Sequence, residues 1–148
     1  MMNKAVIIDF MGTIASFRKL EGTAQAIPGS IEAIKGLSDY FDVFISSKSS
    51  EAYITSWLKK NNLENFVYIV YGFEDGTKNN HIEKILRIDD YEKIIYIADM
   101  PEDFIFKVEI PVIKIAVNVS LSSDLFPKDV CIFKKPLSFD LIKQFIEG

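Results

Sequence analysis

The chain has 148 residues, of which 49% are hydrophobic and 26% charged, a balance typical of one globular domain with a sizeable core. Its 17 Lys and Arg against 21 Asp and Glu give a formal charge of −4, which argues against the basic face that nucleic-acid binding needs. Because no apolar run approaches the roughly 20 residues of a membrane span and no signal-peptide pattern opens the chain, we expect a single cytoplasmic domain over residues 1–148 with no membrane partner.

Short apolar, β-branched runs recur along the chain and predict strands. They lie at Ala5–Ile8, Asp42–Ile45, Phe66–Tyr71, Ile94–Ala98, Val112–Val117 and Val130–Phe133. Several are apolar at consecutive positions, which is typical of strands buried on both faces. Cys131, the single cysteine, lies in the last run and is expected to be a small buried hydrophobe rather than a reactive thiol.

Segments with apolar residues at helical spacing separate most of these runs. Ser30–Leu37 follows Pro28-Gly29, with Ser30 as the expected N-cap. Further helices are expected at Ser50–Asn61, Asn80–Leu86 and Ser138–Ile146. The alternation predicts a doubly wound α/β domain, with a mainly parallel, Rossmann-like sheet and helices on both faces. Such sheets bind ligands beyond the carboxyl ends of their strands.

Polar side chains follow four of the predicted strands. In chain order they are Asp9 with Gly12 and Thr13, Ser46 with Ser47, Lys78, and Asp99 with Asp103. Each alone has a simpler explanation, because strand-end aspartates shape turns, serines cap helices and most lysines are solvated. Together they supply what phosphoryl transfer through a carboxylate needs: a nucleophile, oxygen ligands for a divalent cation, and donors for the phosphate.

The order of these residues resembles the motifs of the haloacid dehalogenase-like (HAD) superfamily, which consists mostly of phosphatases and other phosphotransferases. Asp9-Phe10-Met11-Gly12-Thr13 resembles its first motif, Asp-x-Asp-x-Thr. Ser46 resembles the second motif, Lys78 the third, and Asp99-Met100-Pro101-Glu102-Asp103 the acidic fourth. The resemblance covers the chain from Asp9 to about Asp103, and the remaining segments suit the same Rossmann-like core.

The resemblance implies a role for each matched residue. Asp9 would be the nucleophile that becomes an aspartyl-phosphate. Mg²⁺ would be bound by three oxygens, from the carboxylate of Asp9, the main-chain carbonyl of Met11 and the carboxylate of Asp99. The phosphoryl group would be bound by a second set, namely Lys78, Ser46, Ser47, Gly12 and Thr13. Asp103 would support the metal's water shell or Lys78.

Met11 departs from the superfamily's pattern. In its phosphatases this position is an aspartate, which protonates the leaving group and then activates water. A thioether does neither, and general acid–base help is worth roughly 10²–10⁴-fold, so turnover is expected to be slow unless another group substitutes. Glu74, Asp75 and His81, in or beside the third loop, are the candidates, although His81 is expected to lie on a solvated helix surface.

Only short segments lie where the superfamily inserts cap domains, so we expect no sizeable cap and a site open to a large or exposed phosphorylated substrate. The leading hypothesis is a Mg²⁺-dependent phosphohydrolase or phosphotransferase. The main alternative is a catalytically degenerate module that retains phosphate or metal binding. A phospho-receiver is disfavoured, because Tyr71 and Gly72 occupy the strand end where receivers place the acceptor. The sequence indicates neither the substrate, the oligomeric state nor the role of the polar loop Asn118–Ser123.

Overall fold

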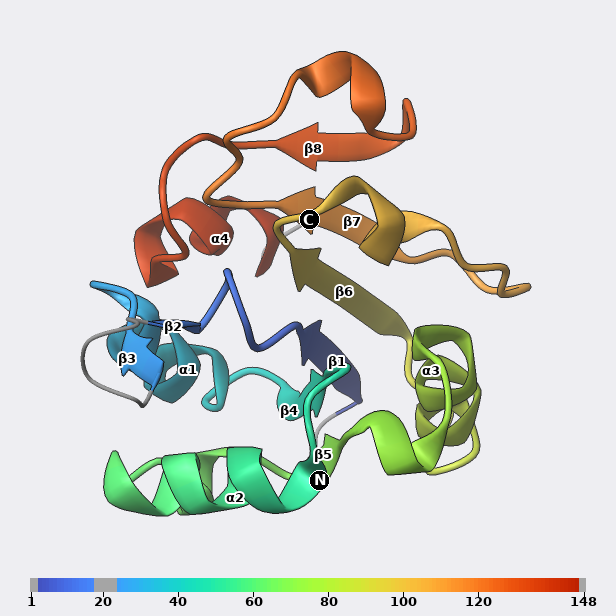
Figure 1. Cartoon of the computed structure of the whole chain (residues 1–148). Helices are drawn as coiled ribbons and strands as arrows, with labels where there is room; N and C mark the ends of the chain where they lie inside the picture. Colours follow the sequence, from blue (N-terminus) through green and yellow to red (C-terminus); the bar gives the residue numbers. More distant parts are fainter. Residues whose placement is uncertain (1–2, 18–23, 147–148) are drawn as a thin grey trace.

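One parallel sheet forms the centre of the protein, which a computed structural model describes at residues 3–17 and 24–146 (Figure 1). Its strand order is β5-β4-β1-β6-β7-β8. The strands are β1 (Lys4–Ile8), β4 (Asp42–Ser46), β5 (Ile69–Tyr71), β6 (Lys93–Ala98), β7 (Ile113–Ala116) and β8 (Val130–Ile132). The order reverses direction between β1 and β6, and ligands of such sheets bind in the crevice beyond the strand ends at this switch point.

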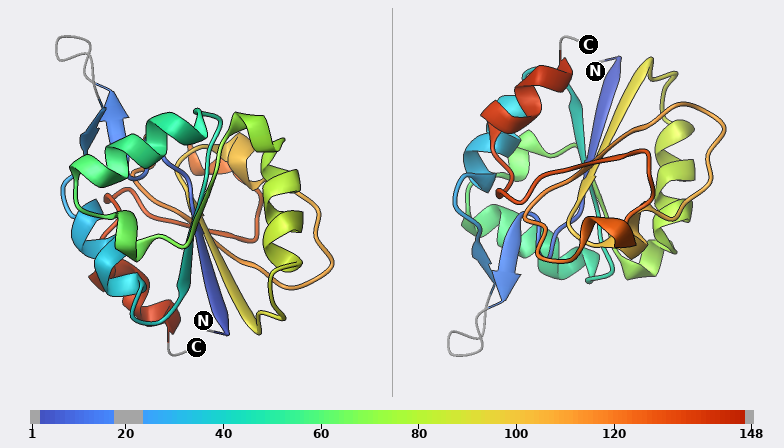
Figure 2. Two further views of the ribbon diagram at one scale, coloured as in Figure 1. Left: turned by 90° about the horizontal axis from the view of Figure 1, so that it is seen from below. Right: turned by 90° about the horizontal axis from the view of Figure 1, so that it is seen from above.

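Helices cover both faces of the sheet, as Figure 2 shows. In the described parts of the chain they are α1 (Ser30–Leu37), α2 (Glu51–Lys60), α3 (Lys78–Leu86) and α4 (Phe139–Ile146). Helices α1, α2 and α4 pack with Val6 and Ile8 of β1, whereas α3 packs on the side of Ala5 and Ile7. Alternate strand residues face opposite sides, so a strand covered on both faces is apolar throughout. The predicted doubly wound fold is confirmed.

A short hairpin, β2 (Ala15–Phe17) and β3 (Ala24–Ala26), lies between β1 and α1 and was not predicted. Helix α2 holds it in place: the Ala24 N–H donates to the Tyr53 hydroxyl at 3.1 Å, and the Trp57 indole N–H donates to the Ala24 carbonyl at 3.0 Å. Between β4 and β5 the chain forms only α2 and a 3₁₀ turn (Glu64–Phe66). Within the described residues these connections form no cap domain, as expected.

Two local predictions are wrong. Ser30 is not the N-cap of α1, because Gly29 holds that position at φ 92° while the buried Ser30 hydroxyl donates to the Ile14 carbonyl at 2.8 Å. Cys131 is exposed, because β8 is an edge strand and its alternate side chains face solvent. Among the described residues, none of the helices has the length and apolar character that crossing a bilayer requires.

Candidate active site

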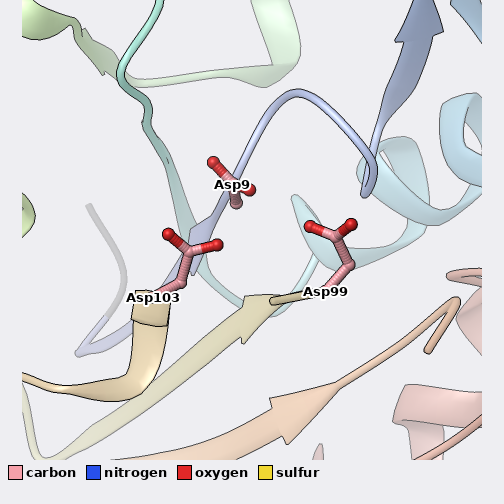
Figure 3. Close-up of side chains that lie close together, drawn as sticks. All are labelled: Asp9, Asp99 and Asp103. Carbon is pink, nitrogen blue, oxygen red and sulfur yellow. The ribbon is translucent and has the colours of Figure 1, made fainter. Parts of the chain in front are cut away.

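Three carboxylates meet beyond the carboxyl ends of β1 and β6. Asp9 follows β1, Asp99 follows β6, and Asp103 lies on the next 3₁₀ turn (Pro101–Phe104). The two strands end together because they pair in parallel register and the Asp9 N–H donates to the Ile97 carbonyl at 2.9 Å. One oxygen from each carboxylate lies within 4.8 Å of the others (Figure 3). Oxygen ligands at this spacing can hold a metal ion.

Lys78 provides the positive charge beside these acids. It is the first residue of α3, after the N-cap Thr77, whose hydroxyl accepts from the Asn80 N–H. Its ammonium donates to Asp9 Oδ1 at 2.6 Å and to the Ser46 carbonyl at 2.9 Å, and lies 3.6 Å from Asp103 Oδ1. The Lys78 side chain is largely buried, so this ion pair is only weakly screened by solvent.

The cluster carries more negative charge than Lys78 offsets. Burial raises the pKa of Asp9, Lys78 lowers it, and Asp99 raises it further. Burial, with the charge of Asp103, raises the pKa of Asp99 to about 6. Burial and the charge of Asp9 likewise raise the pKa of Asp103 to about 6. A divalent cation among the three acids would relieve this repulsion.

Gly12 and Thr13 shape the position of Asp99. Gly12 has φ 85°, and a Cβ added to it would lie 2.1 Å from Asp99 Oδ2. The buried Thr13 hydroxyl donates to Asp99 Oδ1 at 3.4 Å. Asn118, from the polar loop to which the sequence assigned no role, donates to the Gly12 carbonyl at 3.0 Å. The loop after β7 therefore supports the turn of Gly12 and Thr13, which contact Asp99.

Replacing Gly12 with alanine should both destabilise the fold and displace Asp99. The left-handed backbone conformation alone costs roughly 1–2 kcal/mol for a residue with a Cβ. Gly76→Ala is the matched control, because Gly76 has φ 103° and the atoms nearest to its added Cβ belong to the Asn80 side chain. In thermal unfolding both variants should melt earlier. If a divalent cation raises the melting temperature of the wild type, only Gly12→Ala should lose that rise. An unchanged cation response in Gly12→Ala would contradict the close packing of Gly12 on Asp99.

Ser46, the last residue of β4, and Ser47, which follows it, both form hydrogen bonds within the protein. The Ser46 side chain is fully buried, with its hydroxyl 2.7 Å from His81 Nδ1. Ser47 Oγ accepts from the Ser49 N–H at 3.0 Å, and the Ser47 N–H donates to the Tyr71 carbonyl at 3.0 Å. The predicted contact of these hydroxyls with phosphate stays a prediction, whereas the Ser46 carbonyl directly contacts Lys78.

His81 is buried, so its predicted place on a solvated helix surface is wrong. Only 1% of it is exposed, because α3 turns His81, Ile82 and Ile85 toward the sheet. Burial lowers the pKa of His81, which favours the neutral ring. The other two candidates accept hydrogen bonds from backbone groups: Glu74 Oε1 from the Glu51 N–H at the start of α2, and Asp75 Oδ2 from the nearby Gly72 N–H, each at 2.9 Å.

Met11 and Tyr96 complete the surroundings of Asp9. The Met11 side chain is partly buried and packs against the apolar cluster on the side of α1, α2 and α4. Tyr96, on β6, was missed by the sequence analysis, although a polar residue inside an apolar strand run is a visible signal. Its buried hydroxyl has no hydrogen-bond partner within the described residues. Burial, and then the charges of Asp9 and Asp103, raise the pKa of Tyr96 well above its usual range.

The fold and this cluster define the class of protein: a Rossmann-like α/β domain with an acidic, potential metal-binding site at its topological switch point. Comparison of the sequence with models of protein families gives no match. Comparison with curated proteins gives no significant match either. The resemblance to the HAD superfamily therefore rests on the motif residues alone, namely Asp9–Thr13, Ser46, Lys78 and Asp99–Asp103.

Proposed function

We propose that the protein is a Mg²⁺-dependent phosphohydrolase or phosphotransferase of the HAD type, acting through an aspartyl-phosphate on Asp9. The observation that carries the proposal is the 2.6 Å contact between Lys78 Nζ and Asp9 Oδ1, at the strand ends where Asp99 and Asp103 also meet. A carboxylate nucleophile that approaches an anionic phosphate needs positive charge nearby, because the two groups otherwise repel each other.

The donor set fits a hard divalent cation. It consists of carboxylate oxygens, which magnesium prefers, and the pKa values of Asp99 and Asp103 are raised first by burial and then by the charge of a neighbouring acid. Asp9, Asp99 and the Met11 carbonyl would hold the ion, with Asp103 beside its water shell. When bound, Mg²⁺ would neutralise charge on the transferring phosphoryl group and help to orient it.

The chain's own residues supply the nucleophile and the positive charge, whereas the general acid is missing at Met11. Asp9 attacks phosphorus, the bond to the ester oxygen breaks, and the leaving group takes the electron pair and then a proton from water, because Met11 cannot supply one. Water then attacks the aspartyl-phosphate, which releases phosphate and restores the carboxylate. Burial raises the pKa of Asp9, and Lys78 opposes that shift and so favours the carboxylate; the same ammonium would offset charge on the phosphoryl group. Thr13 donates to Asp99 and so orients the second carboxylate.

Stability should respond to Mg²⁺ more strongly at pH 7.5 than at pH 5. Asp99 and Asp103 have pKa values of about 6 in the fold against the ordinary 3.8, so the folded protein binds more protons between these values. The protonated acids therefore contribute to the free energy of unfolding. This contribution is fully present below pH 3.8 and is lost as the pH rises through about 6. A divalent cation competes with protons for the carboxylates of Asp99 and Asp103, so it binds more tightly at pH 7.5, where both are deprotonated.

Thermal unfolding with and without Mg²⁺ at the two pH values tests this expectation. At ten times its dissociation constant the ion contributes about 1.4 kcal/mol, which raises the melting temperature of a domain of this size by several degrees. Asp99→Asn should remove most of the shift at pH 7.5. The exposed carboxylate of Asp129, paired with Lys114, offers the control Asp129→Asn, which should retain it. A shift equal at both pH values would contradict the assignment of the ion to these acids.

The open site favours a large or exposed phosphorylated substrate. In the described residues no additional domain covers the strand ends, and two large apolar side chains beside the site face solvent. Phe73, on the turn before α3, is 61% exposed, and Ile105, two residues after Asp103, is 77% exposed. Single exposed apolar side chains are common on protein surfaces, so the openness of the strand ends, rather than these two residues, supports a large substrate.

A catalytically degenerate module is the second candidate function, and Met11 is the observation that favours it. Its thioether stands where the superfamily's phosphatases have their general acid, and it packs against the core rather than supplying a titratable group. Such a protein would bind metal and phosphate through the same residues without turnover. The assay of an aryl phosphate with and without Mg²⁺, combined with the Asp9 and Met11 variants, separates the two functions.

A further inference from the structure

The buried histidine joins three elements behind the acidic cluster. His81 Nδ1 lies 2.7 Å from Ser46 Oγ at the end of β4, and Nε2 lies 2.8 Å from the Gly72 carbonyl just after β5. The ring also stacks on Tyr71, with centroids 5.5 Å apart and planes 23° apart. Both ring nitrogens therefore have protein partners, each from a different strand end.

The partners determine which nitrogen carries the proton. A carbonyl oxygen only accepts, so Nε2 must be the N–H that donates to Gly72. In the neutral ring Nδ1 then accepts, and the Ser46 hydroxyl must donate to it. The hydroxyl hydrogen of Ser46 consequently points toward α3 and into the protein interior. Ser46 cannot give that hydrogen to a phosphate oxygen while this bond persists.

His81 and Ser46 are connected to Lys78 in two ways, through helix α3 and through the Ser46 carbonyl. Lys78 begins α3 and lies one helical turn before His81, so anchoring the His81 ring also fixes the start of the helix. Lys78 Nζ also donates to the carbonyl of Ser46, the residue whose hydroxyl His81 binds. Ser46 is thus held through its side chain by His81 and through its main chain by Lys78.

We propose that His81 is a positioning residue: by joining Ser46 and Gly72 to α3, it holds the Lys78 ammonium against Asp9. His81 itself does not touch the substrate. The hydroxyl of Ser46 serves this network, and the phosphoryl group is bound at this edge by Lys78. The role assigned to Lys78 rests on the proposed function, whereas the geometry of the network does not.

Nitrogen-15 NMR of the imidazole tests the network directly, because the chain has one histidine and its signals need no further assignment. In the wild-type protein we expect the neutral Nε2–H tautomer with a slowly exchanging ring N–H. Ser46→Ala should shift the Nδ1 resonance and leave the tautomer unchanged. An Nδ1–H tautomer, or a ring that titrates like a solvated histidine, would overturn the proposal.

Chemical labelling of Lys78 tests the positioning. With acetic anhydride and mass spectrometry, the rate at Lys78 is measured relative to Lys143 on α4. His81→Gln keeps an amide donor for Gly72 but loses the bond to Ser46, so Lys78 should label several-fold faster. Ile85→Val is the matched control, because Ile85 is buried on the same helix outside the network. Equal labelling of Lys78 in wild type, His81→Gln and Ser46→Ala would overturn the proposal, and so would faster labelling in the Ile85→Val control alone.

Activity measurements separate this inference from the proposed function. If the wild type hydrolyses an aryl phosphate, His81→Gln should lower kcat with little change in KM, whereas Ile85→Val should leave both unchanged. If the wild type is inactive while Lys78 labelling rises in His81→Gln, the proposed function fails and the positioning role stands. If the wild type is active and neither kcat nor labelling changes in His81→Gln, the positioning role fails and the function stands.

Discussion

Asp9→Asn is expected to abolish the Mg²⁺-dependent hydrolysis of an aryl phosphate. The amide has no anionic oxygen with which to attack phosphorus, and the site also loses one charged ligand for the cation. A loss of roughly 10³-fold corresponds to about 4 kcal/mol of transition-state stabilisation, so the rate should fall to background. Release of p-nitrophenol from p-nitrophenyl phosphate, measured at saturating Mg²⁺, gives the comparison.

The control for this substitution is the same chemical change at an unrelated carboxylate. Asp129 pairs with Lys114 at 2.8 Å on the protein surface, so Asp129→Asn should retain the wild-type rate. Beryllofluoride supplies a measurement that needs no turnover, because it should form an adduct on Asp9 in the wild type and none in Asp9→Asn. Persistent Mg²⁺-dependent hydrolysis in Asp9→Asn would exclude Asp9 as the nucleophile.

Met11→Asp is expected to raise the rate of the same reaction by roughly 10²–10⁴-fold, the usual contribution of a general acid–base group. The new carboxyl would stand two residues after the nucleophile, where it could protonate the leaving group and activate water. Because Met11 packs partly against the core, the substitution should also lower stability by about 1 kcal/mol. The rate is therefore measured well below the melting temperature of each variant.

Two controls distinguish acid–base chemistry from a change in packing. In Met11→Asn the new side chain has nearly the shape of aspartate but no titratable group. In Met11→Leu the side chain stays apolar. Both variants should hydrolyse the substrate at close to the wild-type rate. If the hydrolysis rate rose as much in Met11→Asn as in Met11→Asp, the acid–base explanation would be contradicted. If Met11→Asp stays inactive while the protein still binds phosphate and Mg²⁺, the degenerate binding module becomes the better description.

The architecture and the principal acids of the site follow from local patterns. Apolar residues at consecutive positions in β1, β4 and β6 indicated strands covered on both faces, and the helical segments between them required parallel connections. Parallel strands bring their carboxyl ends to one edge, so residues that follow neighbouring strands meet there. For this reason the proximity of Asp9 and Asp99, ninety residues apart, was predictable without coordinates.

Other features depended on packing between distant segments. Whether His81 is solvated or buried is decided by the side of α3 that faces the sheet, and its partner Ser46 lies 35 residues away. That bond, in turn, directs the Ser46 hydroxyl away from the role its position suggested. The three-residue strands of the β2–β3 hairpin carry too little pattern to be recognised, and they are held by Tyr53 and Trp57 of α2. Local periodicity thus specifies which segments form the sheet and its covering helices, whereas hydrogen bonds between segments specify where each polar side chain of the site is directed.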